Sequence, residues 1–256
     1  MIAEAYIDTY QLHGSPPQNY TCALRAFDGL GTPDQRANRP DRARRHGVIE
    51  LTTYYGARVF EIDGYLSGSD TTDMWTKVDN LKQHFAMTGI QHVLKWRRQG
   101  LPYRERCEVV VGGPLDLPLR VVGPIVTWHA TLVAADPRMY SDTLNTQTFA
   151  AAATLTNAGN FNTPPVITFN GPGTNPGLRN DELAAENEIH IKYTMGSGDA
   201  VVVDVAERTV TLNGADRPDL LDLATSDFWS LGYGDTHVTK LGGAASIQVD
   251  WRDARI

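Results

Sequence analysis

Histidine, cysteine and carboxylate side chains are the groups of this chain that could bind a metal or transfer a proton. The seven histidines are scattered; the closest pair is His84 and His92, and neither an HExxH motif nor a paired Cys/His spacing occurs. Gly-x-Ser-x-Gly elbows, Gly-x-Gly-x-x-Gly turns and phosphate-binding loops are also missing from the sequence. We therefore expect no metal, no cofactor and no nucleotide or serine-hydrolase chemistry.

Three acidic residues of the second half could supply the two carboxylates of a glycosidase or the ligands of a Ca²⁺ ion: Asp199, Asp204 and Glu207. Asp199 falls at a predicted turn, and the other two flank the end of a predicted strand, where carboxylates commonly face water. The solvated alternative is favoured, so the chain is not predicted to be an enzyme.

Two tryptophans, Trp229 and Trp251, could stack against a sugar ring on a glycan-binding surface. A tryptophan at the end of an alternating strand is more often part of the core or its rim. Both alternatives stay open, with the core favoured.

An arginine-rich segment is the most unusual local feature. It holds five arginines within ten residues, together with Pro40 and Asp41: Arg36, Arg39, Arg42, Arg44 and Arg45. Arginines so arranged could grip phosphate or pair with carboxylates of a neighbouring protein chain, or form a solvated loop. Because no aromatic residue is interleaved, DNA is a less suitable partner than another copy or another protein.

The charge balance differs between the two halves of the chain. Residues 1–142 hold 16 basic and 16 acidic side chains, so the remainder has 23 − 16 = 7 basic and 30 − 16 = 14 acidic ones. Neither half is basic, which argues against a general nucleic-acid binder. Two distant cysteines suggest no disulfide framework, and neither a signal peptide nor a membrane-spanning run is recognisable.

The first half is predicted to be a sheet with one helix. Paired strands are expected within residues 48–68, with Gly56 and Gly64 as breaks, and further strands at 92–97, 104–111 and 125–134. A helix is expected between the capping pair Ser69–Asp70 and Gly89, because apolar residues recur there at helical spacing: Met74, Val78, Leu81 and Phe85. Pro137 ends the last strand, which places a domain boundary near residue 142.

The second half shows no helical period, and short alternating strands follow one another between turn residues. Residues 189–193 and 201–205 are predicted to form a hairpin around the glycine-rich loop 196–199. The fold class predicted is mainly β: a β-rich α+β N-terminal domain over 1–142 and a β-sandwich or jelly roll over 143–256.

Several segments, in this order and spacing, carry a resemblance to a known family. They are YGARVFEIDG at 55–64, AADPRMYS at 134–141, NAGN at 157–160, PPVI at 164–167, VD at 203–204 with RTV at 208–210, WSL at 229–231 before GD at 234–235, and VDWRDA at 249–254. The chain resembles the distal tail proteins of long-tailed non-contractile bacteriophages (siphoviruses), including the minor tail proteins so named in phages of high-GC Gram-positive hosts.

The resemblance implies a structural virion protein without enzymatic activity. It implies an N-terminal belt domain that forms a ring, typically a homohexamer, and a C-terminal galectin-like β-sandwich outside it. The ring would be the tail-tip or baseplate hub, joining the tail tube to hub or fibre proteins and touching the tape measure protein. DNA would pass through its lumen without specific binding. Such a protein is assembled in the bacterial host cytoplasm, works in the virion and involves no membrane.

A carbohydrate-binding module that recognises a host-surface glycan is the alternative function. The sugar-site pattern of galectins, His-x-Asn-x-Arg followed by Trp-x-x-Glu-x-Arg, does not occur in the sequence. A galectin-like fold therefore carries no sugar-binding activity over to this chain.

Overall fold

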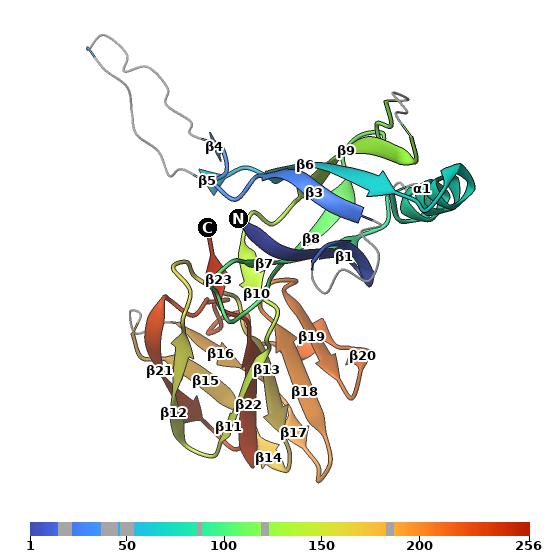
Figure 1. The fold of residues 1–256 in the computed structure, drawn as a ribbon. Helices are drawn as coiled ribbons and strands as arrows, with labels where there is room; N and C mark the ends of the chain where they lie inside the picture. The colour runs from blue at the N-terminus through green and yellow to red at the C-terminus, as the bar shows by residue number, and fades with distance from the viewer. Residues whose placement is uncertain (15–21, 37–45, 47–53, 86–88, 119–122, 183–186) are drawn as a thin grey trace. The chain divides into compact units, whose positions relative to one another are not determined.

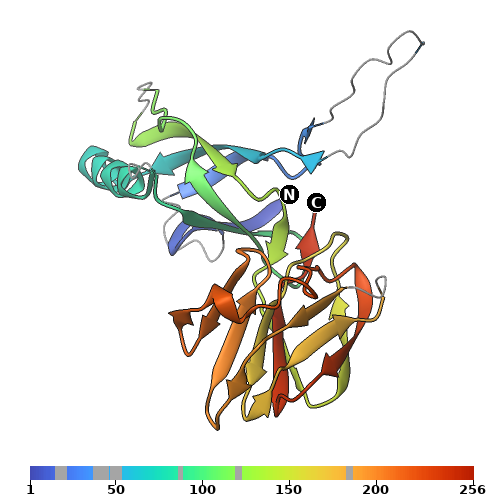
Figure 2. The ribbon, with the colours of Figure 1, turned by 180° about the vertical axis from the view of Figure 1, so that it is seen from behind.

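The computed structural model describes residues 1–14, 22–36, 46, 54–85, 89–118, 123–182 and 187–256 (Figures 1 and 2). The chain divides into two compact units, Met1–Asp142 together with Ile256, and Thr143–Arg255. Each unit buries a hydrophobic cluster of its own. Among the described residues, none of the helices has the length and apolar character needed to cross a bilayer.

The first unit is built on one antiparallel sheet. Its strands are β1 (Ile2–Ile7), β2 (Tyr10–His13), β3 (Cys22–Asp28), β6 (Arg58–Ser67), β7 (His92–Arg98), β8 (Glu105–Val111), β9 (Ile125–Ala134) and β10 (Met139–Ser141). The strand order is β2-β1-β7-β8-β9-β6-β3, with β10 beside β8. The two ends of this order approach each other, since Leu24 N donates to His13 Nδ1 at 3.3 Å. The sheet is therefore curled like a barrel, with β1 and β7 facing β3 and β6 across the core (Figure 1).

Strand β6 contains a glycine in its interior that leaves room for a large side chain of the neighbouring strand. Gly64 pairs with Trp128 of β9 and Leu24 of β3, and a Cβ atom at Gly64 would lie 2.4 Å from the Trp128 ring. The predicted break at Gly64 was wrong, because this glycine makes room for the indole within a continuous strand. The predicted pairing within 48–68 was also wrong for its described part, because β6 pairs with β3 and β9.

Helix α1 (Thr71–Phe85) begins and packs as the sequence predicts. Asp73 N donates to Asp70 Oδ1 at 2.9 Å, and Ser69 N donates to Asp73 Oδ2 at 2.8 Å, so two backbone N–H groups at the helix start are satisfied reciprocally. The predicted apolar stripe is the buried face of the helix. Its last member, Phe85, has its ring centroid 6.0 Å from that of Trp128, which joins the helix to the core of the sheet.

The second unit contains two larger sheets and a short strand pair. The six-stranded sheet has the order β11-β22-β13-β18-β19-β20, the four-stranded sheet the order β12-β21-β15-β16, and β14 pairs with β17. The elements are β11 (Asn145–Phe149), β12 (Ala152–Asn157), β13 (Val166–Asn170), β14 (Gly173–Thr174), β15 (Gly177–Asn180), β16 (Glu188–His190), β17 (Thr194–Met195), β18 (Ala200–Asp204), β19 (Thr209–Leu212), β20 (Ala215–Asp216), the 3-10 helix η1 (Pro218–Leu220), β21 (Gly234–Leu241), β22 (Ser246–Trp251) and β23 (Ala254–Arg255).

One hydrophobic cluster joins the two larger sheets of this unit. Phe169 and Val203 contribute from the six-stranded sheet, and Leu155, Leu178 and Val238 from the four-stranded one. Two sheets that share a core in this way form a β-sandwich. The predicted fold class, mainly β with one helix and a C-terminal sandwich, is confirmed.

The predicted hairpin between residues 189–193 and 201–205 was wrong. Strand β16 pairs with β15 in the four-stranded sheet, whereas β18 pairs with β13 and β19 in the six-stranded one. Alternation shows which side chains face the core but does not show which strand lies alongside. In a sandwich both sheets face the same core, so two successive strands can alternate alike and still lie in different sheets.

Candidate interaction surfaces

The arginine-rich segment lies largely outside the described residues. Arg36 is described and exposed in β4 (Gln35–Arg36), which pairs with β5 (Tyr54–Tyr55). The other predicted interface arginines, Arg39, Arg42, Arg44 and Arg45, are not among the described residues. Tyr54, the partner of Arg36 in the strand register, is 66% exposed, so both described flanks of the segment present side chains to solvent.

Arg58 anchors the chain on both sides of this segment. Its side chain is buried, its Nε donates to Pro137 O at 2.7 Å, and its Nη1 donates to Gly29 O at 2.6 Å and to Gly31 O. Gly29 and Gly31 precede the segment and Arg58 follows it. The sequence reasoning missed this residue, although a signal exists: Arg58 shares the inward positions of its strand with Phe60 and Ile62.

Two basic residues, one on β7 and one just before β8, form ion pairs inside the first unit. Arg97 Nε and Arg104 Nε donate to Glu4 Oε1 at 2.8 and 2.7 Å, and Arg104 Nη2 donates to Glu4 Oε2 at 3.1 Å. The hydrogen bonds from Arg104 and then Arg97, against the opposing effect of burial, lower the pKa of Glu4 to about 2. These two arginines therefore stabilise the fold and are not free charges for a partner.

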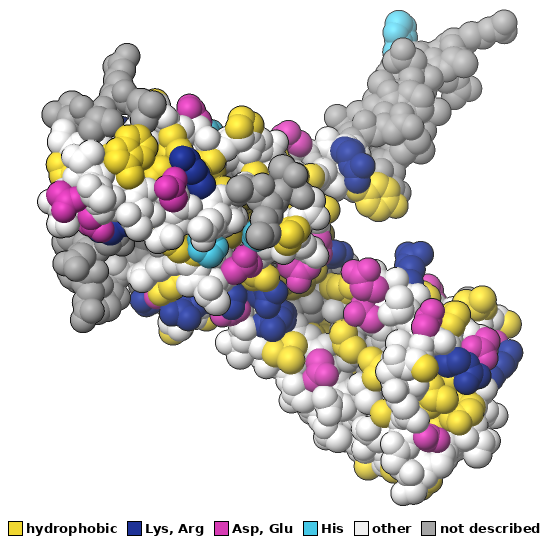
Figure 3. All heavy atoms as spheres, turned by 90° about the vertical axis from the view of Figure 1, so that its right-hand side faces the viewer, with side chains coloured by type: hydrophobic (Ala, Val, Ile, Leu, Met, Phe, Trp, Pro, Cys, Tyr) yellow, Lys and Arg dark blue, Asp and Glu magenta, His cyan; other side chains and the backbone are white. Residues whose placement is uncertain are grey.

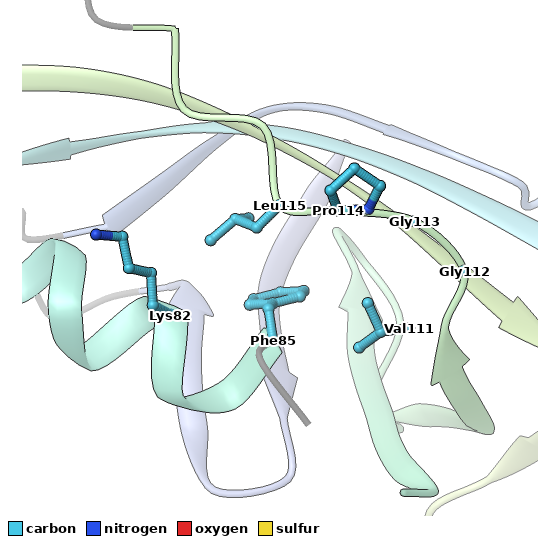
Figure 4. A pocket seen from close by; sticks show the side chains of 7 residues that line it. All are labelled: Lys82, Phe85, Val111, Gly112, Gly113, Pro114 and Leu115. Carbon is cyan, nitrogen blue, oxygen red and sulfur yellow. The ribbon is translucent and has the colours of Figure 1, made fainter. Parts of the chain in front are cut away.

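A hollow of about 570 Å³ lies between α1 and the segment that follows β8 (Figure 4). Lys82 and Phe85 line it from the helix, and residues 111–115 line it from the other side. The lining is apolar apart from Lys82, whose Nζ is 3.2 Å from Asp79 Oδ1. None of these seven residues carries a carboxylate, thiol or imidazole, so the Lys82 amine is the one ionisable group of the lining. In the space-filling view of the α1 side of this unit, charges of both signs are scattered among hydrophobic side chains (Figure 3).

The candidate carboxylates of the second unit stabilise turns. Asp199 accepts from Asn213 Nδ2 at 3.0 Å and from Gly196 N at 2.7 Å, and these hydrogen bonds lower the pKa of Asp199. Asp204 Oδ1 accepts from the backbone N–H of Glu207 at 3.0 Å. Asp199 precedes β18 and Asp204 ends it, so they stand roughly 16 Å apart along the strand. A glycosidase pair needs carboxyl groups within about 10 Å, so these two do not form one. Within the described residues, no group of three or more His, Cys, Asp or Glu side chains is arranged to hold a metal ion.

The two candidate glycan-stacking residues lie in the core of the second unit. Trp229 is 3% exposed and Trp251 is 6% exposed. The indole Nε1 of Trp251 donates to Thr156 O at 3.1 Å. This burial favours the core interpretation of both tryptophans over a sugar-stacking platform.

The comparison with family models and the comparison with solved structures both match this chain to phage proteins. Residues 158–254 match the family model SPP1_Dit, described as the siphovirus-type tail component, C-terminal domain. A search of curated protein sequences gives no match.

Three solved phage structures resemble the chain over nearly its whole length. The crystal structure of the SPP1 Dit protein, described as a paradigm of the hub adsorption apparatus in phages that infect Gram-positive hosts, is 15% identical with a TM-score of 0.76 and covers 99% of both chains. The activated phage P2 baseplate with Ca is 8% identical with a TM-score of 0.57, covering 98% of each chain. The phage p2 baseplate with Sr is 8% identical with a TM-score of 0.55, covering 96% of this chain and 97% of that one.

The whole chain has the fold of the SPP1 Dit protein, and residues 158–254 of its C-terminal unit match the model of the siphovirus-type tail component C-terminal domain. The resemblance to distal tail proteins predicted from the sequence is thereby confirmed.

Proposed function

We propose that this chain is a structural hub protein at the distal end of a phage tail. The observation that carries the proposal is the likeness to SPP1 Dit over 99% of both chains, together with the family match of the C-terminal domain. In this role the chain joins the tail tube to tail-tip or fibre proteins, and it is found in the virion after assembly in the host cytoplasm.

The proposal assigns the chain no catalytic step. Asp199 and Asp204 accept hydrogen bonds within turns, and the one ionisable side chain that lines the described hollow, Lys82, is 3.2 Å from Asp79 Oδ1. A hub acts by binding its neighbours, so its function needs shape and complementary surfaces and no reacting group.

The first unit is proposed to form the belt of a closed ring, with six copies around a lumen that passes DNA without binding it specifically. A ring needs a heterologous interface, in which one face of each copy binds a different face of the next. The tail tube protein binds on one side of the ring and the hub or fibre protein on the other, with the tape measure protein as a further neighbour. The second unit is proposed to stand outside the ring.

Electron microscopy and native mass spectrometry of the purified protein, alone and with the tube protein of the same particle, test this proposal. The expected result is a ring about 100 Å wide, as six domains of ordinary size around a duplex-wide channel require. A chain that stays monomeric with the tube protein present, and that is missing from purified particles, would overturn the proposal.

A further inference from the structure

A row of three valines lies on the outer face of the first unit. Val133 of β9 pairs in register with Val59 of β6 on one side and Val110 of β8 on the other. Phe60, next to Val59, and Leu132, next to Val133, are buried in the core, so this row points outward. Val59 is 45% exposed and Val110 is 38% exposed. A cross-strand row of apolar side chains on an outward face is typical of a surface that a partner covers.

Charged side chains continue this face along β6. Glu61 and Asp63 follow Val59 at intervals of two residues, so they share its side of the sheet at roughly 7 and 14 Å from it. His129 of β9 stands between the two carboxylates: its Nδ1 is 3.0 Å from Asp63 Oδ1 and its Nε2 is 3.0 Å from Glu61 Oε2. Thr131 Oγ1 donates to Glu61 Oε2 at 2.9 Å, which fixes this carboxylate in place.

Two further carboxylates make the face acidic. Asp28 of β3 lies directly opposite Glu61 in the register, an arrangement of like charges that destabilises a sheet by itself. Asp116 is exposed and bridges to His129 through paired backbone hydrogen bonds of 2.9 Å. Within the described part of the chain, no lysine or arginine forms an ion pair with these four carboxylates. The face therefore combines an apolar row with a concentration of negative charge that a partner could neutralise.

Basic side chains that could pair with these carboxylates occur in the same chain. The first 142 residues are neutral as a whole, yet five of their 16 basic side chains fall within residues 36–45. Arginine pairs with carboxylates through two parallel hydrogen bonds, and its methylene groups cover apolar side chains. An arginine-rich segment is thus suited to a face on which valines and carboxylates lie side by side.

We propose that the outer face of β3, β6, β8 and β9, named here the valine–carboxylate face, binds the arginine-rich segment 36–45 of a neighbouring copy of this chain. This proposal rests on the proposed function, because the segment and the face would form the two different surfaces of a heterologous ring contact. The arginines pair with Asp28, Glu61, Asp63 and Asp116, and their alkyl stems cover the valine row.

A charge swap in the full-length chain tests the contact. The face variant is Glu61→Lys with Asp63→Lys, the segment variant is Arg42→Glu with Arg44→Glu and Arg45→Glu, and a third variant carries all five changes. We expect the face variant and the segment variant each to weaken ring assembly about tenfold or more, measured by native mass spectrometry against protein concentration. The combined variant should recover assembly, because every interface then has the opposite but still complementary charges.

Controls separate the contact from effects on folding and on net charge. Glu207→Lys with Asp216→Lys makes the same charge change at exposed positions of the second unit and should assemble like the unaltered protein. Glu61→Gln with Asp63→Asn removes the charge with little change of shape, and circular dichroism and Tm show whether each variant is folded. This variant should lose assembly to a smaller extent than the lysine variant.

The possible outcomes separately test the face, the segment that binds it and the proposed function. Rings of normal stability from a folded face variant would overturn the proposed contact and leave the ring itself intact. Failure of the combined variant to recover would mean that the face is needed but that the arginine-rich segment is not its occupant. If the unaltered protein forms no ring with the tube protein present, the contact between copies fails, and if the chain is also missing from purified particles, the proposed function fails with it.

Discussion

At the scale of single residues, Gly64 and Trp128 show how closely two strands of the first unit are matched. They face each other in the register of β6 and β9, and a Cβ on Gly64 would lie 2.4 Å from the indole. We expect Gly64→Ala to lower the free energy of unfolding by about 1 to 3 kcal/mol, because the added methyl overpacks a site with no room. Urea denaturation monitored by tryptophan fluorescence measures this loss.

Gly31→Ala is the matched control for this substitution. Gly31 lies in the same unit, and a Cβ atom added there meets no atom within 4 Å. Its effect should be within about 0.5 kcal/mol of zero. Equal effects of the two substitutions would contradict the close packing of Gly64 against Trp128.

The carboxyl group of Glu4 makes the stability of the first unit depend on pH. Its folded-state pKa of about 2 lies below its ordinary value of 4.5, so its ion pairs stabilise the fold above about pH 4.5, and this contribution is lost as the pH falls through 2. We expect Glu4→Gln to cost about 1 to 2 kcal/mol at neutral pH, since Arg97 and Arg104 are partly exposed.

The pH dependence of that difference is the informative measurement. The stabilities of the unaltered protein and of Glu4→Gln, from urea titrations over a range of pH, should converge as the pH falls from about 4.5 towards 2. A difference that stays constant over this range would show that the charge of Glu4 is not what stabilises the unit.

At the scale of elements, the start of α1 depends on a capping aspartate. Asp70 Oδ1 accepts the Asp73 N–H at 2.9 Å. Replacing Asp70 by alanine should lower the free energy of unfolding by about 1 kcal/mol, because one N–H at the helix start loses its partner. Thermal denaturation followed by circular dichroism checks this. Asp79→Ala, an exposed change in the middle of the same helix, should have a clearly smaller effect.

Helices and strands could be predicted from the sequence where one buried face makes apolar residues recur at a regular spacing. Met74 and Val78 lie at helical spacing because one face of α1 is buried, and Trp128 and Leu132 lie at strand spacing because one face of β9 is buried. Strand partners could not be predicted in the same way. The alternation around Ile189 and Val203 is compatible with either one hairpin or two sheets that share a core, and only the long-range packing decides between them.

The candidate site could be predicted only in part. The arginine-rich segment stands out because its charge density is visible in the sequence, but the valine–carboxylate face combines residues from β3, β6, β8 and β9. No single stretch of the sequence contains it. Val59 and Glu61 alone resemble the outward-facing residues of any half-buried strand. They form part of an interaction surface only together with Val133 and His129 of the neighbouring strand. The tryptophans were ambiguous because an indole serves a core and a sugar site equally well.

At the scale of the whole molecule, this chain and SPP1 Dit share a fold over 99% of both chains although their sequences are only 15% identical. This is possible because the fold depends on apolar residues at inward positions and on turn chemistry, and many sequences satisfy both. A fold of this kind does not specify the function by itself. The proposed hub role therefore depends on the surfaces through which copies and neighbours would bind.

Salt should weaken a ring held partly by arginine–carboxylate pairs. The proposed contact involves exposed charges, which are screened over about 10 Å at 0.1 M salt and over about 3 Å at 1 M. We expect the ring fraction in native mass spectrometry and sedimentation to fall as sodium chloride is raised over this range, and the combined charge-swap variant to show the same dependence. Rings that become more stable with salt would indicate a contact dominated by the valine row.

Cryo-electron microscopy of the intact particle, reconstructed at the far end of its tail, shows whether this chain forms a ring there. We expect several copies of this chain closed into a ring around an open channel at the end of the tube, with their first units in contact. A reconstruction in which the chain is absent from the tail end, or is present as isolated copies that do not touch one another, would contradict it.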